Sequence, residues 1–217
     1  MSGKANNLRI LMEHGVRVPR GFAIPPDHYT NAIHPIREKI FAALPNHLEV
    51  EDLFDGITIP ENTSQLINQE LSRFSDVENF AVRSSAYIVS KNKNICEDSE
   101  SISLAGQFES FLSVPKHELS NAIKKCWSSL FNERSIYRFK ADKRYISDST
   151  MTVVVQEMIE AKTSAVMMTL DPQGGGEVGA IECTWGPCEA LVAGMVSPDE
   201  IIFRRNLGEI STYSCGK

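Results

Sequence analysis

The chain has 217 residues and a mass of 24.2 kDa, which is enough to bury a sizeable core without disulfide or metal cross-links. It carries 22 Lys and Arg against 28 Asp and Glu, a formal net charge of −6, with 42% hydrophobic and 23% charged residues. These values exclude disordered, collagen-like and coiled-coil classes, and an acidic chain is a poor candidate for non-specific nucleic-acid binding, which depends on basic residues.

The first third of the chain predicts mainly helices. Leu8, Leu11 and Met12 follow helical spacing and are succeeded by Gly15, a typical residue just after a helix end. Residues 16–24 predict a short strand and a turn. Residues 25–44 predict a helix that Pro35 kinks or splits, and Asn62 or Thr63 is expected to cap the next helix.

The middle of the chain mixes both kinds of element. Residues 79–84 predict a short buried strand, and the polar, turn-rich stretch from 87 to 101 predicts mostly loop. Residues 111–114 predict a strand. Residues 116–138 predict a long helix with Leu119, Ile123, Trp127 and similar residues on one face.

The last third predicts mainly strands. Residues 152–159 and 164–170 are rich in β-formers and predict a hairpin, while the three glycines at 174–176 predict a loop. Residues 178–184 and 200–203 predict further strands, with a helix-like segment at 189–194 between them. Because helices concentrate early and strands late, the order of elements indicates an α+β fold.

Several function classes lack their signals. Residues 1–10 contain no apolar signal-peptide core, and no apolar run is long enough to cross a membrane. The five cysteines follow no metal-binding spacing, so free thiols in a cytoplasmic protein are expected. The chain has neither a P-loop motif nor a nucleophile elbow beside a histidine.

Two basic residues stand in positions that suit an anion. Lys4 precedes the first predicted helix, where free N–H groups and the helix dipole favour negative charge, although such a lysine can also be simply solvated. Arg83 ends a predicted strand just before Ser84 and Ser85. It could clamp a phosphate bidentately or pair with a surface carboxylate, and the spacing does not choose between these readings.

A turn and a strand end offer further candidates. Gly106 and Gln107 belong to a small-residue turn whose backbone could approach phosphates, or which is a plain tight turn. Gln156 and Glu157 end a predicted strand, where backbone groups can bond to an adenine edge. Met158 would then pack on the ring, or it is ordinary core.

Glu189 follows a Trp-Gly turn at the start of a possible helix. Its carboxylate could meet a ribose or a lysine, or it could be an ordinary negative charge at a helix N-terminus.

Taken in order, these segments resemble a known family. The chain is similar over nearly its whole length to the N-terminal nucleotide-binding domain of phosphoenolpyruvate synthase, which the related pyruvate phosphate dikinases and rifampin phosphotransferases share. The matching stretches are GKANNLRILMEHGVRVPRGFAI (3–24), FAVRSSA (80–86), LAGQFESFLSV (104–114), CWSSLFNERSIYR (126–138), VVVQEMI (153–159), MMTLDP (167–172) and IECTWGPCEALVAGMVSPDE (181–200). The resemblance implies an ATP-grasp fold, in which two α+β lobes hold ATP.

The resemblance also implies roles for the matched residues. The family's lysine and arginine contact the ATP phosphates and support transfer, a mobile small-residue loop covers the phosphates, and a strand-end hinge receives adenine. The corresponding positions are Lys4 and Arg83 for the basic pair, Gly106 and Gln107 for the loop, Gln156, Glu157, Met158 and Ile159 for the hinge, and Glu189 for the glutamate after the Trp-Gly motif.

The chain departs from the family pattern at four places. Ser2 replaces a glycine of the Gly-Gly-Lys motif and the short leader before it is absent, Cys188 replaces a glycine, and residues 87–95 form a nine-residue insertion where a single residue is expected. The chain stops at Lys217, before the family's Asp-x-Glu and Gln-x-Arg motifs. The Mg²⁺ ligands that the resemblance implies are therefore expected outside this chain.

The expected organisation follows from this resemblance. Residues 1–110 would form a helix-rich first lobe with strand 79–84 and an inserted loop 87–95, residues 111–172 a second lobe with a long helix and a hairpin at 152–170, and residues 173–217 the return strands of an incomplete fold. The partners implied are nucleotide and downstream phosphohistidine and acceptor-binding domains, with neither nucleic acid nor membrane.

The implied function is the ATP-binding part of a phosphoenolpyruvate synthase-like phosphotransferase, with pyruvate as the final acceptor in the parent family. This chain alone is expected to be inactive. Two alternatives stay open: the ATP-binding front end of an antibiotic or small-molecule phosphotransferase or ligase, and a degenerate, non-catalytic nucleotide-binding module.

Overall fold

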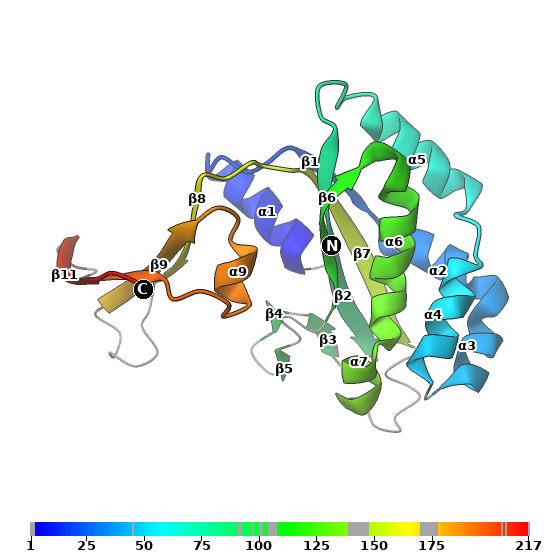
Figure 1. Cartoon of the computed structure of the whole chain (residues 1–217). Helices are drawn as coiled ribbons and strands as arrows, with labels where there is room; N and C mark the ends of the chain where they lie inside the picture. The colour runs from blue at the N-terminus through cyan, green and yellow to red at the C-terminus, as the bar shows by residue number, and fades with distance from the viewer. Residues whose placement is uncertain are drawn as a thin grey trace. The chain divides into compact units, whose positions relative to one another are not determined.

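The computed structural model describes residues 3–44, 46–90, 93–96, 98–99, 102–103, 108–138, 148–169, 178–204, 206 and 208–216, with the backbone alone at 88–103 and 138. The chain separates into two compact units, Met1–Met158 and Ile159–Lys217 (Figure 1). Each unit is α+β, as the order of predicted elements indicates, and each is described by itself.

The first helix ends as its sequence predicts. Helix α1 (Gly3–Glu13) is followed by Gly15 with φ of 76°. The N–H of Gly15 donates to the carbonyl of Met12 and that of Val16 to the carbonyl of Leu11, both at 3.0 Å. These two bonds form a Schellman motif, which requires the left-handed conformation that glycine adopts without strain.

Proline divides the next helical segment. The predicted helix over residues 25–44 is split into α2 (Pro26–Ile33), the 3₁₀ turn η1 (His34–Ile36) and α3 (Arg37–Ala43), with Pro35 inside η1. The predicted effect of Pro35 is therefore confirmed. The ring of proline cannot continue the α-helical hydrogen bonds through this position.

Two helices of the first unit differ from expectation. Helix α5 (Glu61–Leu71) has Pro60 at its N-cap, so the predicted capping by Asn62 or Thr63 is wrong. Thr63 is instead fully buried, with its Oγ1 2.8 Å from Nδ1 of His28. Helix α4 (His47–Asp55), which was not predicted, begins after Asn46, whose side chain accepts from the N–H of Glu49.

The predicted helix over residues 116–138 is interrupted. It comprises η2 (Lys116–Glu118), α6 (Leu119–Ser128), η3 (Ser129–Phe131) and α7 (Glu133–Arg138). The break falls at Asn132, which is extended, with φ of −64° and ψ of 163°. Its side chain accepts from the N–H of Ser135 at 2.8 Å and so caps a new helix, which hydrophobic spacing alone cannot reveal.

The first unit is built on an antiparallel sheet around strand β2 (Asn79–Ser90). Along one edge β2 pairs with β7 (Ser149–Glu157), which pairs in turn with β1 (Gly21–Ile24). Along its other edge β2 pairs with β6 (Ser110–Pro115) and with β3 (Lys93–Cys96).

The expected inserted loop at 87–95 is wrong where the structure describes it. Residues 87–90 continue β2, and β3 pairs back on them from Cys96 opposite Tyr87 to Lys93 opposite Ser90. Tyr87, Ile88 and Val89 have the β-propensity that favours extension, and polar neighbours do not prevent it in an edge hairpin. A two-stranded pair, β4 (Asp98–Ser99) and β5 (Ile102–Ser103), follows.

The register of β2 and β7 gives this sheet two unlike faces. The core face carries Phe80, Val82 and Ala86 of β2 beside Met151, Val153 and Val155 of β7, all buried under α2 and α6. The opposite face, here called the α1 face, carries Ala81, Arg83 and Ser85 of β2 beside Thr152, Val154 and Gln156 of β7. Among the helices of the first unit, Figure 1 shows α1 on that side and α2, α4 and α6 on the core side.

Strand β7 does not form the predicted hairpin. Both of its edges are occupied within the first unit, by β1 and β2, so no edge remains for the next strand. Strand β8 (Thr163–Met168) pairs with β9 (Val178–Trp185) in the second unit instead. Strands β7 and β8 were both predicted, but the prediction that they pair with each other was wrong.

The second unit contains an antiparallel sheet in the order β11-β10-β9-β8. Strand β10 (Asp199–Arg204) and the short helix α9 (Glu189–Val192) lie near their predicted positions. Strand β11 (Glu209–Ser214), every residue of which is exposed, was not predicted. The predicted glycine loop at 174–176 lies outside the described residues.

The unit boundary differs from the boundaries expected at residues 110 and 172. Strand β6, helix α6 and strand β7 all lie in the first unit with β2, and the chain separates after Met158.

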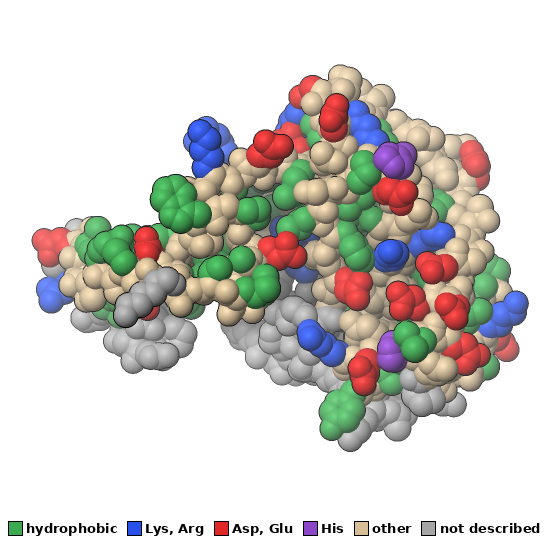
Figure 2. Space-filling view, in the orientation of Figure 1, with side chains coloured by type: hydrophobic (Ala, Val, Ile, Leu, Met, Phe, Trp, Pro, Cys, Tyr) green, Lys and Arg blue, Asp and Glu red, His purple; other side chains and the backbone are tan. Residues whose placement is uncertain are grey.

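Acidic side chains cover much of the helical side of the first unit (Figure 2). Helix α4 alone exposes Glu49, Glu51, Asp52 and Asp55. This surface repels phosphate, so an anion site is better sought on the α1 face. Among the described residues, no helix has the length and apolar character needed to cross a membrane.

The close packing of the core face predicts that a cavity there lowers the stability of the first unit. We expect Met151→Ala, at a fully buried position of β7, to destabilise the first unit by about 2–5 kcal/mol, because the surrounding side chains cannot fill the space. Met12→Ala, at a position 62% exposed, is the control and should have little effect.

Urea unfolding followed by tryptophan fluorescence measures this difference. Trp127 is buried in the first unit and Trp185 is exposed in the second, so a Trp185→Phe background isolates the signal of the first unit. Equal midpoints for the two methionine variants would contradict the assignment of the core.

Candidate nucleotide site

Lys4 lies beside a strand that follows it by 80 residues. Its Nζ donates to the carbonyl oxygen of Ser84 at 2.7 Å, and its backbone N–H donates to Oγ of Ser85 at 3.3 Å. The first turn of α1 is thereby fixed to β2. Two of the predicted phosphate contacts, Lys4 and Arg83, are thus brought close together.

Arg83 occupies the α1 face of β2, opposite Ser110 of β6 and Val154 of β7. Its side chain is exposed, and no hydrogen bond or ion pair joins it to another described residue. Of the two readings that the sequence leaves open, pairing with a surface carboxylate is therefore not seen within the described chain.

Buried polar groups lie next to this basic pair. Ser85 and Thr152 face each other across the β2–β7 pair, and both are almost fully buried. The hydroxyl of Ser85 is bonded by Lys4, while Oγ1 of Thr152 has no hydrogen-bond partner among the described residues. The α1 face is thus polar where the opposite face is hydrophobic.

The predicted hinge residues lie at the end of β7, on the same sheet. Gln156 is 5% exposed, and its Nε2 donates to the carbonyl of Pro19 at 3.2 Å. The backbone N–H of Met158 donates to the carbonyl of Asn79 at 3.0 Å. Ile159 is 52% exposed and begins the second unit.

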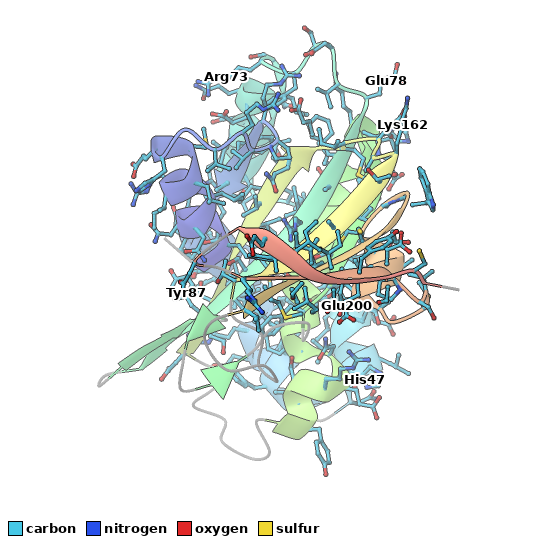
Figure 3. All side chains as sticks on the ribbon, turned by 90° about the vertical axis from the view of Figure 1, so that its left-hand side faces the viewer. His47, Arg73, Glu78, Tyr87, Lys162 and Glu200 are labelled. Atoms are coloured by element: carbon cyan, nitrogen blue, oxygen red, sulfur yellow. The ribbon has the colours of Figure 1, made fainter. Side chains whose placement is uncertain are left out.

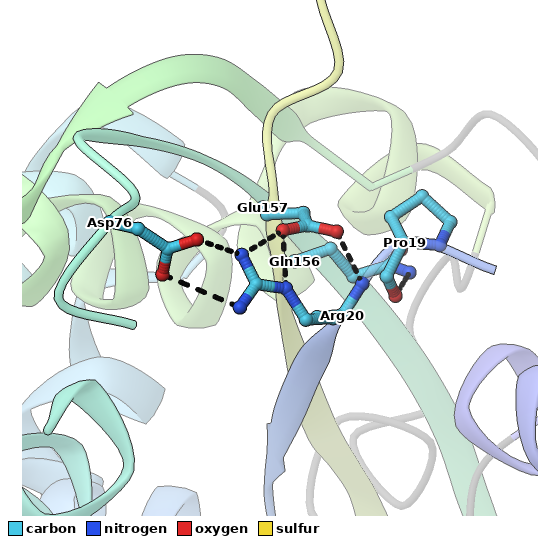
Figure 4. Close-up of polar contacts among 5 residues, drawn as sticks. All are labelled: Pro19, Arg20, Asp76, Gln156 and Glu157. Atoms are coloured by element: carbon cyan, nitrogen blue, oxygen red, sulfur yellow. Dashed lines mark hydrogen bonds and ion pairs between the residues drawn. The ribbon is translucent and has the colours of Figure 1, made fainter. Parts of the chain in front are cut away.

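Glu157 is held by an arginine that sequence reasoning did not identify. Its carboxylate accepts from the backbone N–H and the Nε of Arg20, at 2.9 and 2.8 Å, while its own N–H donates to the carbonyl of Arg20 at 2.8 Å. Nη2 of Arg20 lies 2.7 Å from Oδ2 of Asp76 (Figure 4). Arg20 also lies over the ring of Phe74, 5.5 Å from its centroid.

The pKa values of these groups follow from the contacts. Hydrogen bonds from the guanidinium lower the pKa of Asp76, and the hydrogen bond from the Arg20 N–H, followed by those of its side chain, lowers the pKa of Glu157. The pKa of Arg20 is raised, mainly by its bonds to Asp76 and then to Glu157. All three groups are therefore charged at neutral pH.

The structure does not place the remaining predicted residues relative to this group. Gly106 and Gln107 lie outside the described residues. Glu189 is an exposed residue at the start of α9 in the second unit, whose placement relative to the first is not described.

A separate hollow in the first unit contains none of the predicted residues. It is lined by α4, the segment before β6, and the turn leading into α7, and His47 lies at it (Figure 3). Glu51, Glu109 and Glu133 dominate its charge. Burial, then the charge of Glu51, raises the pKa of Glu109, and such a site does not suit a phosphate.

The described residues contain no group suited to bind a metal ion. Among the described residues, no three His, Cys, Asp or Glu side chains lie close enough together to hold an ion. The arrangement of Lys4 and Arg83 instead supplies positive charge and donors to an anion.

Comparison with known proteins shows the class of domain to which the chain belongs. The whole chain, residues 1–217, matches the family described as the pyruvate phosphate dikinase AMP/ATP-binding domain. The chain belongs to that family, and the resemblance seen in its motifs is confirmed.

Several curated proteins are similar to it. A probable phosphoenolpyruvate synthase of Archaeoglobus fulgidus is 30% identical over 100% of this chain and 30% of its own length. A rifampicin phosphotransferase of Streptomyces sviceus is 32% identical over 97% of this chain and 25% of its own length. A prodigiosin synthesizing transferase of Serratia marcescens is 31% identical over 97% of this chain and 23% of its own length. The chain thus spans no more than about a third of the length of these relatives.

The close approach of β1 to β7 predicts a requirement for glycine at the hinge. A Cβ on Gly21 would lie 2.5 Å from the carbonyl oxygen of Val155. We expect Gly21→Ala to destabilise the first unit by about 1–3 kcal/mol, because the strands must separate. Gly56→Ala is the control, since its Cβ would meet nothing nearer than 3.6 Å. Equal urea midpoints for both variants would show that the strands adjust freely.

The lowered carboxyl pKa values predict a pH dependence. A carboxylate whose pKa is lowered by folding stabilises the fold above its ordinary pKa, and this stabilisation is lost as pH falls through the lower folded value. We therefore expect Asp76→Asn to reduce the urea midpoint only slightly at pH 7, because the pair is exposed, and by progressively less as pH falls below the ordinary aspartate pKa of 3.8. Asp52→Asn, at an exposed position of α4, is the control. An effect of Asp76→Asn that does not diminish as pH falls would contradict a charge-based role.

Proposed function

We propose that this chain is the ATP-binding portion, of ATP-grasp type, of a phosphotransferase similar to phosphoenolpyruvate synthase. In such an enzyme phosphate passes from ATP to a carrier histidine and then to an acceptor. The carrier and the acceptor would be supplied by further domains. A cytoplasmic location is part of this proposal.

The observation that carries the proposal is the register of β2 and β7. Arg83 stands opposite Val154 on the α1 face, and the hinge residue Glu157 stands opposite Phe80 on the same pair of strands. Three residues separate the two positions, or roughly 10 Å along a strand. That separation suits a nucleotide with its base at the hinge and its phosphates beside Arg83 and Lys4.

Each proposed contact has a physical role. Lys4 and Arg83 neutralise the charge of the phosphates, with Arg83 donating as a planar fork. Gly106 and Gln107 would cover the phosphates with backbone donors, and Glu189 would contribute a polar contact. At the hinge, Gln156, Glu157, Met158 and Ile159 would meet adenine through backbone atoms and apolar side chains.

Phosphoryl transfer depends mainly on positioning and on stabilising negative charge. The residues of this chain would hold the triphosphate and place positive charge beside it. Mg²⁺ would enter with the nucleotide and neutralise phosphate charge, and no described group of residues is assigned to it. We therefore expect the isolated chain to bind ATP without sustained turnover.

A second candidate differs only in the acceptor. Relatives with similar identity are called rifampicin phosphotransferase, so the same ATP-binding portion could serve transfer to an antibiotic or another small molecule. Pyruvate is the acceptor if the likeness to phosphoenolpyruvate synthase extends to the remaining domains.

Calorimetric titration of the 217-residue chain with ATP and Mg²⁺ tests the proposal. We expect Arg83→Ala to weaken ATP binding about tenfold or more, as the loss of a charge-assisted contact implies, while adenosine binding stays within twofold. Arg73→Ala is the matched control. It removes an arginine that is 65% exposed and pairs with Glu70 at the end of α5 (Figure 3).

The outcomes are distinct. A chain that binds neither ATP nor adenosine would contradict the nucleotide-binding proposal and favour a degenerate module. Unchanged ATP affinity in Arg83→Ala would remove Arg83 from the phosphate site. Sustained ATP hydrolysis by the wild-type chain would show that the isolated chain is not inactive.

A further inference from the structure

The segment Pro19–Gly21 contacts the end of β7 over three consecutive residues. The carbonyl of Pro19 accepts from the side chain of Gln156, Arg20 forms three hydrogen bonds with Glu157, and Gly21 lies against Val155. The contacts of Pro19 and Arg20 join positions 137 residues apart in the chain. We infer that Arg20 is a positioning residue of the adenine subsite, acting through Glu157. This inference rests on the proposed function.

The carboxylate of Glu157 is already occupied by Arg20. Both of its oxygens accept hydrogen bonds from Arg20, and its side chain is 18% exposed. An occupied carboxylate is a poor hydrogen-bond partner for a base or a ribose. A nucleotide at the hinge would therefore meet the backbone of Glu157 and Met158, and the position of that backbone decides the affinity.

Arg20 is itself held by Asp76 and Phe74. Its guanidinium contacts both oxygens of Asp76, at 3.4 and 2.7 Å, and lies over Phe74. Phe74 is 5% exposed and packs against Phe22 and Phe80, with ring centroids 6.1 and 5.8 Å away. The aromatic cluster and Asp76 hold the guanidinium in position. Through its bond to Glu157, the guanidinium in turn holds the end of β7 in position.

The contacts of Arg20 position the end of β7 more than they stabilise the fold. Arg20 and Asp76 are half or more exposed, and ion pairs at such sites contribute little to folding stability. The cluster nevertheless fixes the last residues of β7 immediately before the chain passes into the second unit. We therefore expect the cluster to affect ligand affinity at the hinge, because a binding surface that is oriented in advance binds more tightly.

Adenine binding and phosphate binding should therefore respond differently to the loss of Arg20. Arg20 acts at the hinge, while Lys4 and Arg83 lie about three residues further along the strands. Loss of Arg20 should weaken ligands that carry adenine and leave the phosphate contacts intact. This pattern is the reverse of the one expected for Arg83.

Titration of the 217-residue chain with adenosine, ATP and tripolyphosphate tests the inference. We expect Arg20→Ala to weaken adenosine and ATP about five- to tenfold and tripolyphosphate less than twofold, because only the base loses a preorganised surface. Arg20→Lys keeps the charge but loses the fork, so it should recover only part of the affinity. Asp76→Asn should lie between the wild type and Arg20→Ala, and Arg73→Ala should match the wild type.

Hydrogen exchange gives a second measurement that needs no ligand. The amide hydrogens of Glu157 and Met158 should exchange faster in Arg20→Ala than in the wild type, while those of the central residues of β7 stay protected. Unchanged exchange at these two amides would overturn the inference even if affinity fell.

The affinities separate the remaining outcomes. Equal losses for tripolyphosphate and adenosine would mean a general structural effect and overturn the positioning role. Unchanged affinities in Arg20→Ala, with a wild type that binds ATP, would overturn it while leaving the proposed function intact. A wild-type chain that binds none of the three ligands would overturn the proposed function and this inference with it.

Discussion

The antiparallel pairing of β2 with β7 is the constraint on which the first unit depends. It extends over nine residues of each strand and assigns every side chain to the core face or the α1 face. A shift of one residue would exchange the two faces, placing Arg83 in the hydrophobic core and Val82 beside Lys4. The fully buried set on the core face, from Phe80 to Val155, makes such a shift costly. The stability of the core therefore fixes the geometry of the site.

Charge is divided between the surfaces of a chain that is acidic as a whole. The helical side exposes the carboxylates of α4, whereas Lys4 and Arg83 lie on the α1 face. Within the acidic chain, the Arg20 cluster neutralises two carboxylates at the end of β7, where an unpaired negative charge would oppose a phosphate ligand. The proposed phosphate site of this acidic domain therefore depends on two basic residues and not on an extended basic patch.

The sequence predicted local features well and distant pairings poorly. The end of α1 at Gly15 and the division at Pro35 follow from backbone chemistry that a few adjacent residues determine. The partner of β7 does not, because alternating β-formers do not indicate which strand lies beside them, and proximity along the chain wrongly suggested β8. Lys4 and Arg83 were predicted as site residues from residue type and family motif, whereas Arg20 was not. Its role arises only where two segments 137 residues apart meet.

The place of β7 has a consequence for the order in which the chain acquires its structure. β7 is the last strand of the first unit along the sequence, yet it lies between β1 and β2 in space. During synthesis, β1 and β2 emerge long before the strand that joins them, and their edges remain open until then. Sheets closed by such distant contacts fold slowly and expose unpaired edges meanwhile. Because the α1 face carries polar residues, these early segments expose less hydrophobic surface for aggregation.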